Sequence, residues 1–204
     1  MKNPRAFTLI ELLIVVAIIA ILAAIAVPNF LEAQTRAKTS RCMADMRSLA
    51  TAVEAYSVDW NRYTPYGRID SGGTVQFPAS INAFSDRMSF IGPAVTTPVA
   101  YITAVPTDPF AVDFQHPQTQ LIRQIEYLNL RQHVDNFGAS PPAFAAGLIP
   151  AWGLWRMVGA GPDRDRGQDI KSNIVYDPTN GTVSDGDVVR CQRISESRIN
   201  PSAP

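Results

Sequence analysis

Histidine and cysteine are scarce in this sequence. Its 204 residues include two of each: His116 and His133, and Cys42 and Cys191. Neither histidine has a partner at metal-ligand spacing, and there is no H-E-x-x-H, G-x-S-x-G or phosphate-binding-loop lysine motif. An excess of charge is also lacking, because 18 basic residues balance 18 acidic ones, whereas nucleic-acid-binding domains are normally basic. We therefore expect neither an enzyme nor a nucleic-acid-binding protein.

One long apolar run dominates the N-terminus. The run Phe7–Val27 contains a single charged side chain, Glu11. As a helix of about 20 residues it would span ~30 Å, the thickness of a bilayer core. A carboxylate at that depth costs ~2.5–3.5 kcal/mol on insertion scales, which predicts a partner or a specific role. Because Lys2 and Arg5 precede the run, the positive-inside rule predicts a cytoplasmic N-terminus.

Two simpler interpretations of this run remain to be weighed. A cleaved secretory signal has an apolar stretch of only 7–15 residues followed by an A-x-A-like site, so it fits poorly. A plain membrane anchor fits the length of the run but leaves Glu11 unexplained. The acid is therefore the residue that most needs a functional explanation.

The first residues of the chain resemble the class III leader of type IV pilins and type II secretion pseudopilins. The resemblance is carried by Ala6, by the F-T-L-I-E sequence of Phe7–Glu11 and by the apolar run that follows. It implies that a prepilin peptidase cuts between Ala6 and Phe7 and methylates the new N-terminal amine. It also implies that Glu11 pairs with the amine of a neighbouring subunit during assembly. Most members of the family have Gly where this chain has Ala6.

The sequence after the run stays helical and becomes amphipathic. Pro28 matches a helix-kinking proline common in the family and should bend the helix near the lipid surface. Apolar residues recur at alternating steps of four and three, which predicts a buried stripe of Cys42, Met46, Leu49, Val53 and Tyr56. The opposite face is expected in water and carries Arg41, Asp45, Arg47, Ser48 and Glu54. The helix is predicted to end at Val58–Asn61, shortly before Pro65.

Two further stretches resemble the major pseudopilins. Tyr56–Pro65 resembles the Y-x-x-D-x-G-R-Y-P sequence that follows the long helix in that family, with Asn61 in place of Gly. Tyr101–Phe110 resembles the Y-L-x-x-L-P-x-D-P-W/F turn that leads into the family's sheet. We expect two loops, because turn-forming residues are frequent in two segments. One is Tyr66–Pro98, between the two motifs, and the other is Phe137–Pro150, between predicted strands.

Short strands are predicted in the C-terminal half. Gln118–Val134 is compatible with a short helix or with a strand at Ile125–Gln132, and the resemblance favours the strand. Alternation predicts another strand at Trp152–Val158. Asn173–Tyr176 and Thr182–Arg190 are expected to pair across an Asn-Gly turn. The predicted fold class is α+β, with a long N-terminal helix packed on a small antiparallel sheet.

Three aspartates follow the strand predicted at Trp152–Val158. Asp163, Asp165 and Asp169 lie in a Gly-rich loop that resembles the calcium loop of major pseudopilins. Their carboxylates suit Ca²⁺, which takes six to eight oxygen ligands. Arg164 and Arg166 are interleaved and can instead neutralise the carboxylates by salt bridging. The sequence predicts a calcium site and leaves a solvated Asp/Arg turn as the alternative.

The two cysteines invite a disulfide in an oxidising compartment. Cys42 lies on the predicted stripe, and Cys191 follows the last predicted strand. A bridge would tie the helix to the C-terminal edge of the head, and closing so long a loop contributes ~4–5 kcal/mol at most. Two separate buried thiols are the alternative.

The resemblance implies a structural subunit with four parts: a leader at 1–6, a transmembrane and assembly helix at 7–29, an amphipathic helix at 30–60 and a periplasmic head at 61–204. Such a subunit crosses the inner membrane once and polymerises with its own kind into a periplasmic filament of type II secretion. Its implied partners are prepilin peptidase, other pseudopilins and the inner-membrane secretion platform. The alternatives are a type IV pilin or minor pilin used for adhesion, motility or DNA uptake, and a membrane-tethered periplasmic binding protein or enzyme.

Overall fold

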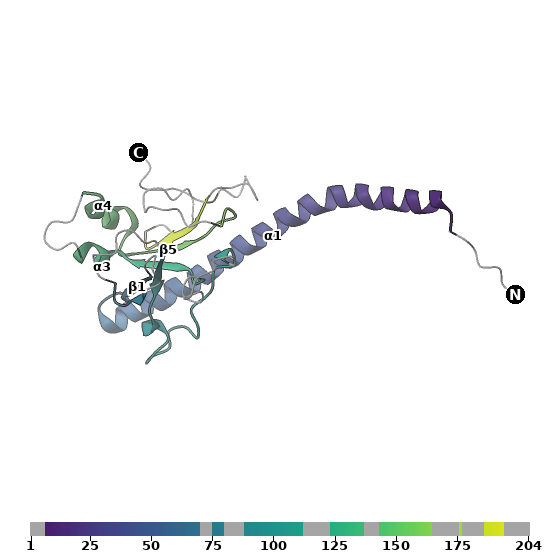
Figure 1. The fold of residues 1–204 in the computed structure, drawn as a ribbon. Coiled ribbons are helices and arrows are strands. Elements are labelled where there is room, and N and C mark those ends of the chain that lie inside the picture. The colour runs from purple at the N-terminus through teal and green to yellow at the C-terminus, as the bar shows by residue number, and fades with distance from the viewer. Residues whose placement is uncertain are drawn as a thin grey trace.

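A single helix, α1 (Leu9–Trp60), forms the axis of the molecule. The computed structural model describes residues 7–69, 75–79, 88–111, 123–136, 143–164, 176 and 186–193. The 52 residues of α1 extend for about 78 Å. Its N-terminal half projects from the head as a bare rod, and its C-terminal half lies against the head (Figure 1). The helix ends where the sequence predicts, because Asn61 takes a left-handed conformation with φ of 51°.

Pro28 lies inside α1, which continues through it without interruption. A proline in a helix removes one backbone hydrogen bond and crowds the preceding turn, so it bends a helix more readily than it ends one of this length. Figure 1 shows α1 following a curved course between its free end and the head. That curve agrees with the bend expected near this proline.

The buried face of α1 confirms the predicted stripe and corrects two residues of the predicted water face, Asp45 and Glu54, which are half-buried. All five stripe residues are buried: Cys42, Met46, Leu49, Val53 and Tyr56. Glu54 was expected in water, but this is wrong. Its side chain is half-buried and accepts a hydrogen bond from Trp155. The head covers a wider arc of the helix than the apolar stripe alone, so it also reaches this carboxylate.

The described residues of the head contain two three-stranded antiparallel sheets. One has the order β2–β1–β3, from Val75–Gln76, Tyr66–Ile69 and Met88–Ile91. The other has the order β4–β5–β6, from Glu126–Asn129, Trp155–Gly159 and Val188–Cys191. The core lies where the buried stripe of α1 meets the second sheet. The α+β class with a small antiparallel sheet is confirmed.

The first sheet corrects the prediction that Tyr66–Pro98 is a loop with little regular structure. Strand β1 pairs along its whole length with β3, from Tyr66 opposite Ile91 to Ile69 opposite Met88. Strand β1 contains Gly67, and the ring of Phe90 covers this glycine so closely that an added Cβ would lie 2.3 Å from the ring. An aromatic side chain covering a strand glycine restores the packing that the glycine lacks. A short 3₁₀ helix, η1 (Pro93–Val95), follows β3.

Helices occupy two places where the sequence predicted strand or loop. In the described part of Phe137–Pro150, helix α4 (Ala143–Trp152) replaces the predicted loop, because its apolar residues Leu148 and Trp152 pack into the core. The strand predicted at Ile125–Gln132 is confirmed only as β4, after which the chain turns into α3 (Leu130–Asp135).

The last two predicted strands fall partly outside the described residues. Of Asn173–Tyr176, only Tyr176 is described, and its N–H donates to Asp187. The end of Thr182–Arg190 forms the start of β6, which continues to Cys191. The pairing expected across the Asn-Gly turn lies outside the described residues.

Candidate functional site

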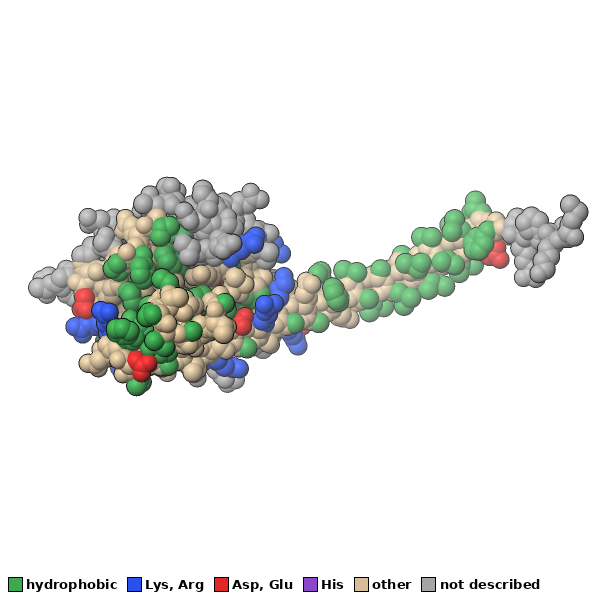
Figure 2. Space-filling model, turned by 90° about the horizontal axis from the view of Figure 1, so that it is seen from below, with side chains coloured by type: hydrophobic (Ala, Val, Ile, Leu, Met, Phe, Trp, Pro, Cys, Tyr) green, Lys and Arg blue, Asp and Glu red, His purple; other side chains and the backbone are tan. Residues whose placement is uncertain are grey.

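The most unusual surface of this protein is the projecting half of α1. All sixteen Val, Ile, Leu and Phe side chains between Phe7 and Leu31 are exposed, by 46–81%. Figure 2 shows these hydrophobic side chains on the rod. By length and composition alone, α1 is apolar enough to cross a membrane. Exposed apolar patches of this size mark a membrane or protein contact, so the rod requires lipid or other protein around it.

Glu11 is held at the N-terminus of this rod by Thr8. The Glu11 carboxylate accepts hydrogen bonds from the Thr8 backbone N–H at 2.8 Å and from the Thr8 hydroxyl at 2.6 Å. In return the Glu11 N–H donates to the Thr8 hydroxyl at 3.3 Å, which completes a capping box. The acid thus satisfies donors at the helix end that lipid cannot satisfy. Glu11 stands out in the sequence as the one acid of the apolar run, whereas Thr8 is signalled only by the T-x-x-E spacing of a capping box.

The predicted processing site lies at the edge of the described residues. Phe7 precedes the helix and is 72% exposed, and Ala6 lies outside the described residues. Cleavage between Ala6 and Phe7 and pairing of Glu11 with a neighbour's amine remain predictions.

A network around Glu54 fastens α1 to the head. The two carboxylate oxygens of Glu54 accept hydrogen bonds from Trp155 Nε1 at 2.7 Å and from the Tyr63 hydroxyl at 3.0 Å. The Tyr63 hydroxyl also accepts a bond of 2.7 Å from the Gln192 side chain, just after β6. We call Glu54, Tyr63, Trp155 and Gln192 the Glu54 network. Sequence reasoning missed it because an acid beside a helical stripe usually faces water.

The two stretches that resemble major pseudopilins serve as structural contacts in the head. Asp108 accepts hydrogen bonds from the N–H groups of Ala160 at 2.7 Å and Phe110 at 2.9 Å, so it joins the D-P-F turn to the end of β5. The Tyr101 hydroxyl donates to Asp59 at 2.7 Å and accepts from Trp60 at 3.2 Å. Asp108 thus connects the loop that follows η1 to the second sheet, and Tyr101 connects the same loop to the C-terminal end of α1.

The aspartate loop begins where β5 ends. Gly161 approaches Gly186 so closely that a Cβ on it would lie 1.7 Å from the Gly186 oxygen, and Asp163 follows in the next turn. Asp165 and Asp169 lie outside the described residues. In the part of the chain that the structure describes, no three His, Cys, Asp or Glu side chains form a metal-binding group. Calcium at Asp163, Asp165 and Asp169 remains a prediction.

Both cysteines are buried in one core, Cys42 on α1 and Cys191 at the end of β6. The sulfur of Cys42 faces Gly159, where an added Cβ would lie 2.7 Å from it, whereas Cys191 pairs with Arg156. Side chains alternate between the two faces along a strand, and cross-strand pairs share a face. Gly159 and Arg156 are three residues apart on β5, so their side chains point to opposite faces of the sheet. Cys42 therefore packs on one face of this sheet, and Cys191 lies on the other. The arrangement lends the predicted bridge no support, and the bridge is still to be tested.

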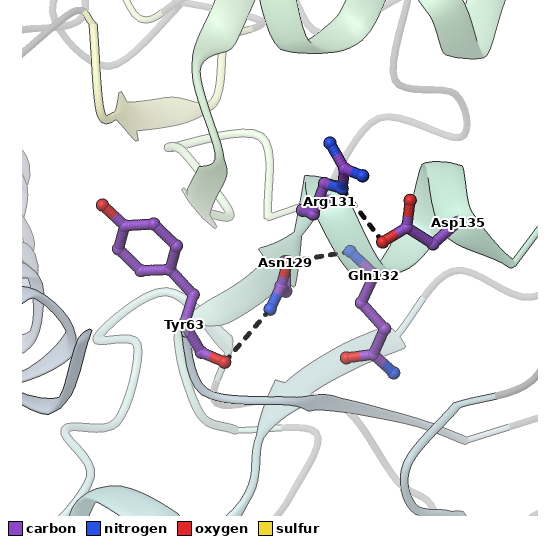
Figure 3. Close-up of polar contacts among 5 residues, drawn as sticks. All are labelled: Tyr63, Asn129, Arg131, Gln132 and Asp135. Carbon is purple, nitrogen blue, oxygen red and sulfur yellow. Dashed lines mark hydrogen bonds and ion pairs between the residues drawn. The ribbon is translucent and has the colours of Figure 1, made fainter. Parts of the chain in front are cut away.

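A groove of about 830 Å³ opens beside the C-terminal end of α1. Asn129 donates to the carbonyl of Tyr63 at 3.4 Å and accepts from the Gln132 N–H at 3.0 Å, and Arg131 pairs with Asp135 at 3.0 Å (Figure 3). Asn129 also caps α3. The amides of the groove therefore hold β4 and α3 against the loop after α1. Among its lining residues we find no pairing of a nucleophile with a base.

Comparison with known proteins places these features in a family. The family model described as the prokaryotic N-terminal methylation motif matches residues 1–27. The type II secretion system core protein G of Pectobacterium carotovorum is 32% identical over 117 residues, which cover 55% of this chain and 66% of that protein. This chain is a member of the type IV pilin and pseudopilin superfamily. No solved structure matches it.

Two pilins of the superfamily match a shorter part of the chain with higher identity. The type IV major pilin protein PilA of Myxococcus xanthus is 50% identical over 66 residues, 31% of this chain and 30% of that protein. The type IV wide pilus major component PilA4 of Thermus thermophilus is 50% identical over 64 residues, 31% of this chain and 49% of that protein. The chain thus spans less than half the length of these two pilins. The match to protein G exceeds the 52 residues of α1, so it includes part of the head.

Proposed function

We propose that this pilin-like protein is a structural subunit that polymerises through α1 into a periplasmic filament of type II secretion. The observation that carries the proposal is the exposed apolar rod, whose sixteen large apolar side chains are 46–81% exposed and are not covered by the described part of the head. Lipid covers such a surface in the membrane-inserted precursor, and the rods of neighbouring copies cover it in a filament. The role is mechanical and requires no catalytic site.

The proposed topology follows from charge and processing. Lys2 and Arg5 keep the N-terminus cytoplasmic, and the head follows the span into the periplasm. Prepilin peptidase cuts between Ala6 and Phe7 and methylates the Phe7 amine. The mass of the mature N-terminal peptide from native membranes tests this step, because an intact Met1–Ala6 would contradict it.

Glu11 supplies the register of assembly in this proposal. Among the described residues, the donors that its carboxylate accepts from are the neutral N–H and hydroxyl of Thr8. The amine of Phe7 in an adjacent copy would add a positive charge, and an ion pair in an apolar surrounding is favourable only when its geometry is good. Staggers that leave the acid without a counter-charge are then disfavoured.

Two substitutions at Glu11 separate its charge from its capping role. Glu11→Gln keeps a side chain that can complete the capping box but removes the charge, whereas Glu11→Ala removes both. We expect both variants to insert into the membrane like the wild type and to be absent from sedimented filaments. Asp135→Asn, which removes an exposed acid that pairs with Arg131 in the head, is the control and should assemble normally. Normal assembly of Glu11→Gln would refute the counter-charge role.

Proteins of this superfamily form two kinds of filament, the type II secretion filament and the type IV pilus. The secretion branch is supported by the match to protein G, which extends into the head. The pilus branch is supported by the 50% identity to two pilins, which covers 31% of this chain in each case. Deleting the gene distinguishes them. We expect loss of exported proteins from the medium with surface pili intact, and the converse result would assign the protein to a pilus.

A further inference from the structure

The head begins very close to the end of the apolar rod. Leu31 is the last large apolar residue of the rod and is 49% exposed, whereas Thr35 is already half-buried and Thr39 is buried at 4%. Because α1 is continuous, Thr39 lies about 12 Å beyond Leu31 along the axis. The polar headgroup layer of a bilayer is itself ~5–8 Å thick. The end of the head nearest the rod, at the level of Thr35 and Thr39, must therefore lie next to the lipid headgroups when the rod is in the membrane.

Basic side chains surround α1 at this level. Arg36 and Arg41 are exposed, with 60% and 71% of their side chains accessible, and the Lys38 ammonium lies 5.9 Å from the centre of the Phe110 ring. Figure 2 shows Lys and Arg side chains gathered where the rod leaves the head. We call Arg36, Lys38 and Arg41 the basic collar. Their Cα atoms lie roughly 8, 10 and 15 Å beyond Leu31, and long side chains can reach several ångströms back toward the lipid.

Two acids accompany the collar. Glu32 pairs with Arg36, and Asp45 lies 3.7 Å from Arg41. Ion pairs this exposed contribute little, and each guanidinium has five N–H donors, more than one carboxylate uses. The collar therefore keeps donors available for a second anionic partner. Phosphate suits them, since the guanidinium fork binds two phosphate oxygens at once.

We propose that the basic collar binds the phosphate groups of anionic phospholipids at the outer surface of the membrane that α1 crosses. This inference rests on the membrane insertion in the proposed function and adds a partner that the span alone does not require. The contact holds the head against the bilayer while the subunit waits for assembly. It must break when the subunit leaves the membrane, so it opposes extraction of the subunit into the filament.

The test uses the full chain in lipid nanodiscs. A fluorescent donor is attached at Ser40→Cys, an exposed position inside the collar, and the native cysteines are buried at 0% and 2%. Energy transfer is measured to a headgroup-labelled lipid, either phosphatidylglycerol or phosphatidylcholine, at equal concentration. Basic residues near an anionic surface gain up to roughly fivefold each at low salt, so we expect at least about twofold enrichment of phosphatidylglycerol. Sodium chloride at ~0.5 M should abolish it.

Charge variants give the decisive comparison. Replacing the collar by Gln (Arg36→Gln, Lys38→Gln and Arg41→Gln together) should remove the enrichment. Neutralising the two acids with Glu32→Gln and Asp45→Asn should increase it. The matched control, Arg62→Gln with Arg131→Gln, removes two arginines that line the groove beside the far end of α1 and should change nothing.

The possible failures are distinguishable. A chain that stays outside the nanodiscs would contradict the membrane insertion and this inference together. An incorporated chain that transfers energy equally to both lipids would overturn the lipid contact and leave the filament proposal standing. Unchanged enrichment after neutralising the collar would also overturn it. The same holds if neutralising the collar alters cross-linking between copies but not the lipid preference, because the collar is then a contact between subunits.

Discussion

Removing the carboxylate of Glu54 should loosen the head from its own helix. In Glu54→Ala, the indole N–H of Trp155 and the hydroxyl of Tyr63 lose their acceptor on α1. Trp155 is buried at 3% exposure, so water cannot readily replace the lost partner. A hydrogen bond to a charged group contributes ~1.5–3 kcal/mol, and an unsatisfied buried donor costs ~1–3 kcal/mol. The half-buried position of Glu54 places the expected loss at about 3 kcal/mol.

The assay is unfolding of the full chain in detergent, followed by near-ultraviolet circular dichroism of the aromatic side chains. A loss of about 3 kcal/mol in the free energy of unfolding corresponds to a decrease in Tm of roughly 6–12 °C for a protein of this size. Glu54→Gln retains an acceptor for the indole and should lose about 1 kcal/mol, the difference between a charged and a neutral hydrogen bond.

Glu32→Ala is the control for stability, because it removes an acid of the same helix that makes an exposed pair with Arg36 and no contact with the Glu54 network. We expect it to cost less than about 0.5 kcal/mol. A double-mutant cycle of Glu54→Ala with Trp155→Phe should give a coupling free energy above about 1 kcal/mol. Equal stability of the Glu54→Ala and Glu32→Ala proteins would refute the reasoning, since it would mean that the Glu54 network contributes no more than a surface charge.

Two further predictions concern protons and metal. Burial, with Arg68 and Arg156 nearby, lowers the pKa of His133 from 6.5 to about 4. Between these two pKa values His133 is protonated in the unfolded chain but neutral in the folded chain. The free energy of unfolding should therefore fall by up to about 3 kcal/mol as the pH drops from 6.5 toward 4. His133→Gln should flatten the pH dependence of Tm between 6.5 and 5, and an unchanged slope would exclude His133 as its source. Calorimetric titration of the full chain with Ca²⁺ should release heat and raise Tm, while Asp165→Asn with Asp169→Asn abolishes both; no heat from the wild type would contradict the calcium proposal.

The helix and its buried stripe could be predicted because their signals are local. Stripe residues such as Met46 and Val53 recur at helical spacing, and Asn61 with Pro65 marks the end of the helix within a few residues. Glu11 could be identified for the same reason, since one acid in an apolar run is visible without any structure. The T-x-x-E spacing of Thr8 and Glu11 is an equally local signal, so the capping box could be predicted from the sequence as well.

The first sheet and α4 could not be predicted because their stability comes from distant contacts. Strand β1 is completed by β3, whose paired residues lie 19 to 25 positions further along the chain, and Gly67 becomes a good strand residue only once the Phe90 ring covers it. Helix α4 contains Pro150 and Gly147, which favour a loop locally, and its place is set by the burial of Trp152.

The Glu54 network illustrates the same limit for the candidate site. A carboxylate on a helix has the same sequence pattern whether it meets water or an indole N–H, and only the folded position of Trp155 decides between them. The sequence therefore predicts which residues of α1 are apolar enough to be buried, but not how much of the helix the head surrounds.

One helix serves both as the anchor and as the backbone of the head, and this makes the protein a rigid shaft. An α-helix advances 1.5 Å and turns 100° with each residue. A single residue inserted between Glu11 and Thr35 would therefore swing the whole head by about 100° around the shaft while barely lengthening it. The number of residues between Glu11 and the head thus fixes the rotation of the head about the helix axis relative to Glu11. Deleting one residue would change that rotation by as much as inserting one.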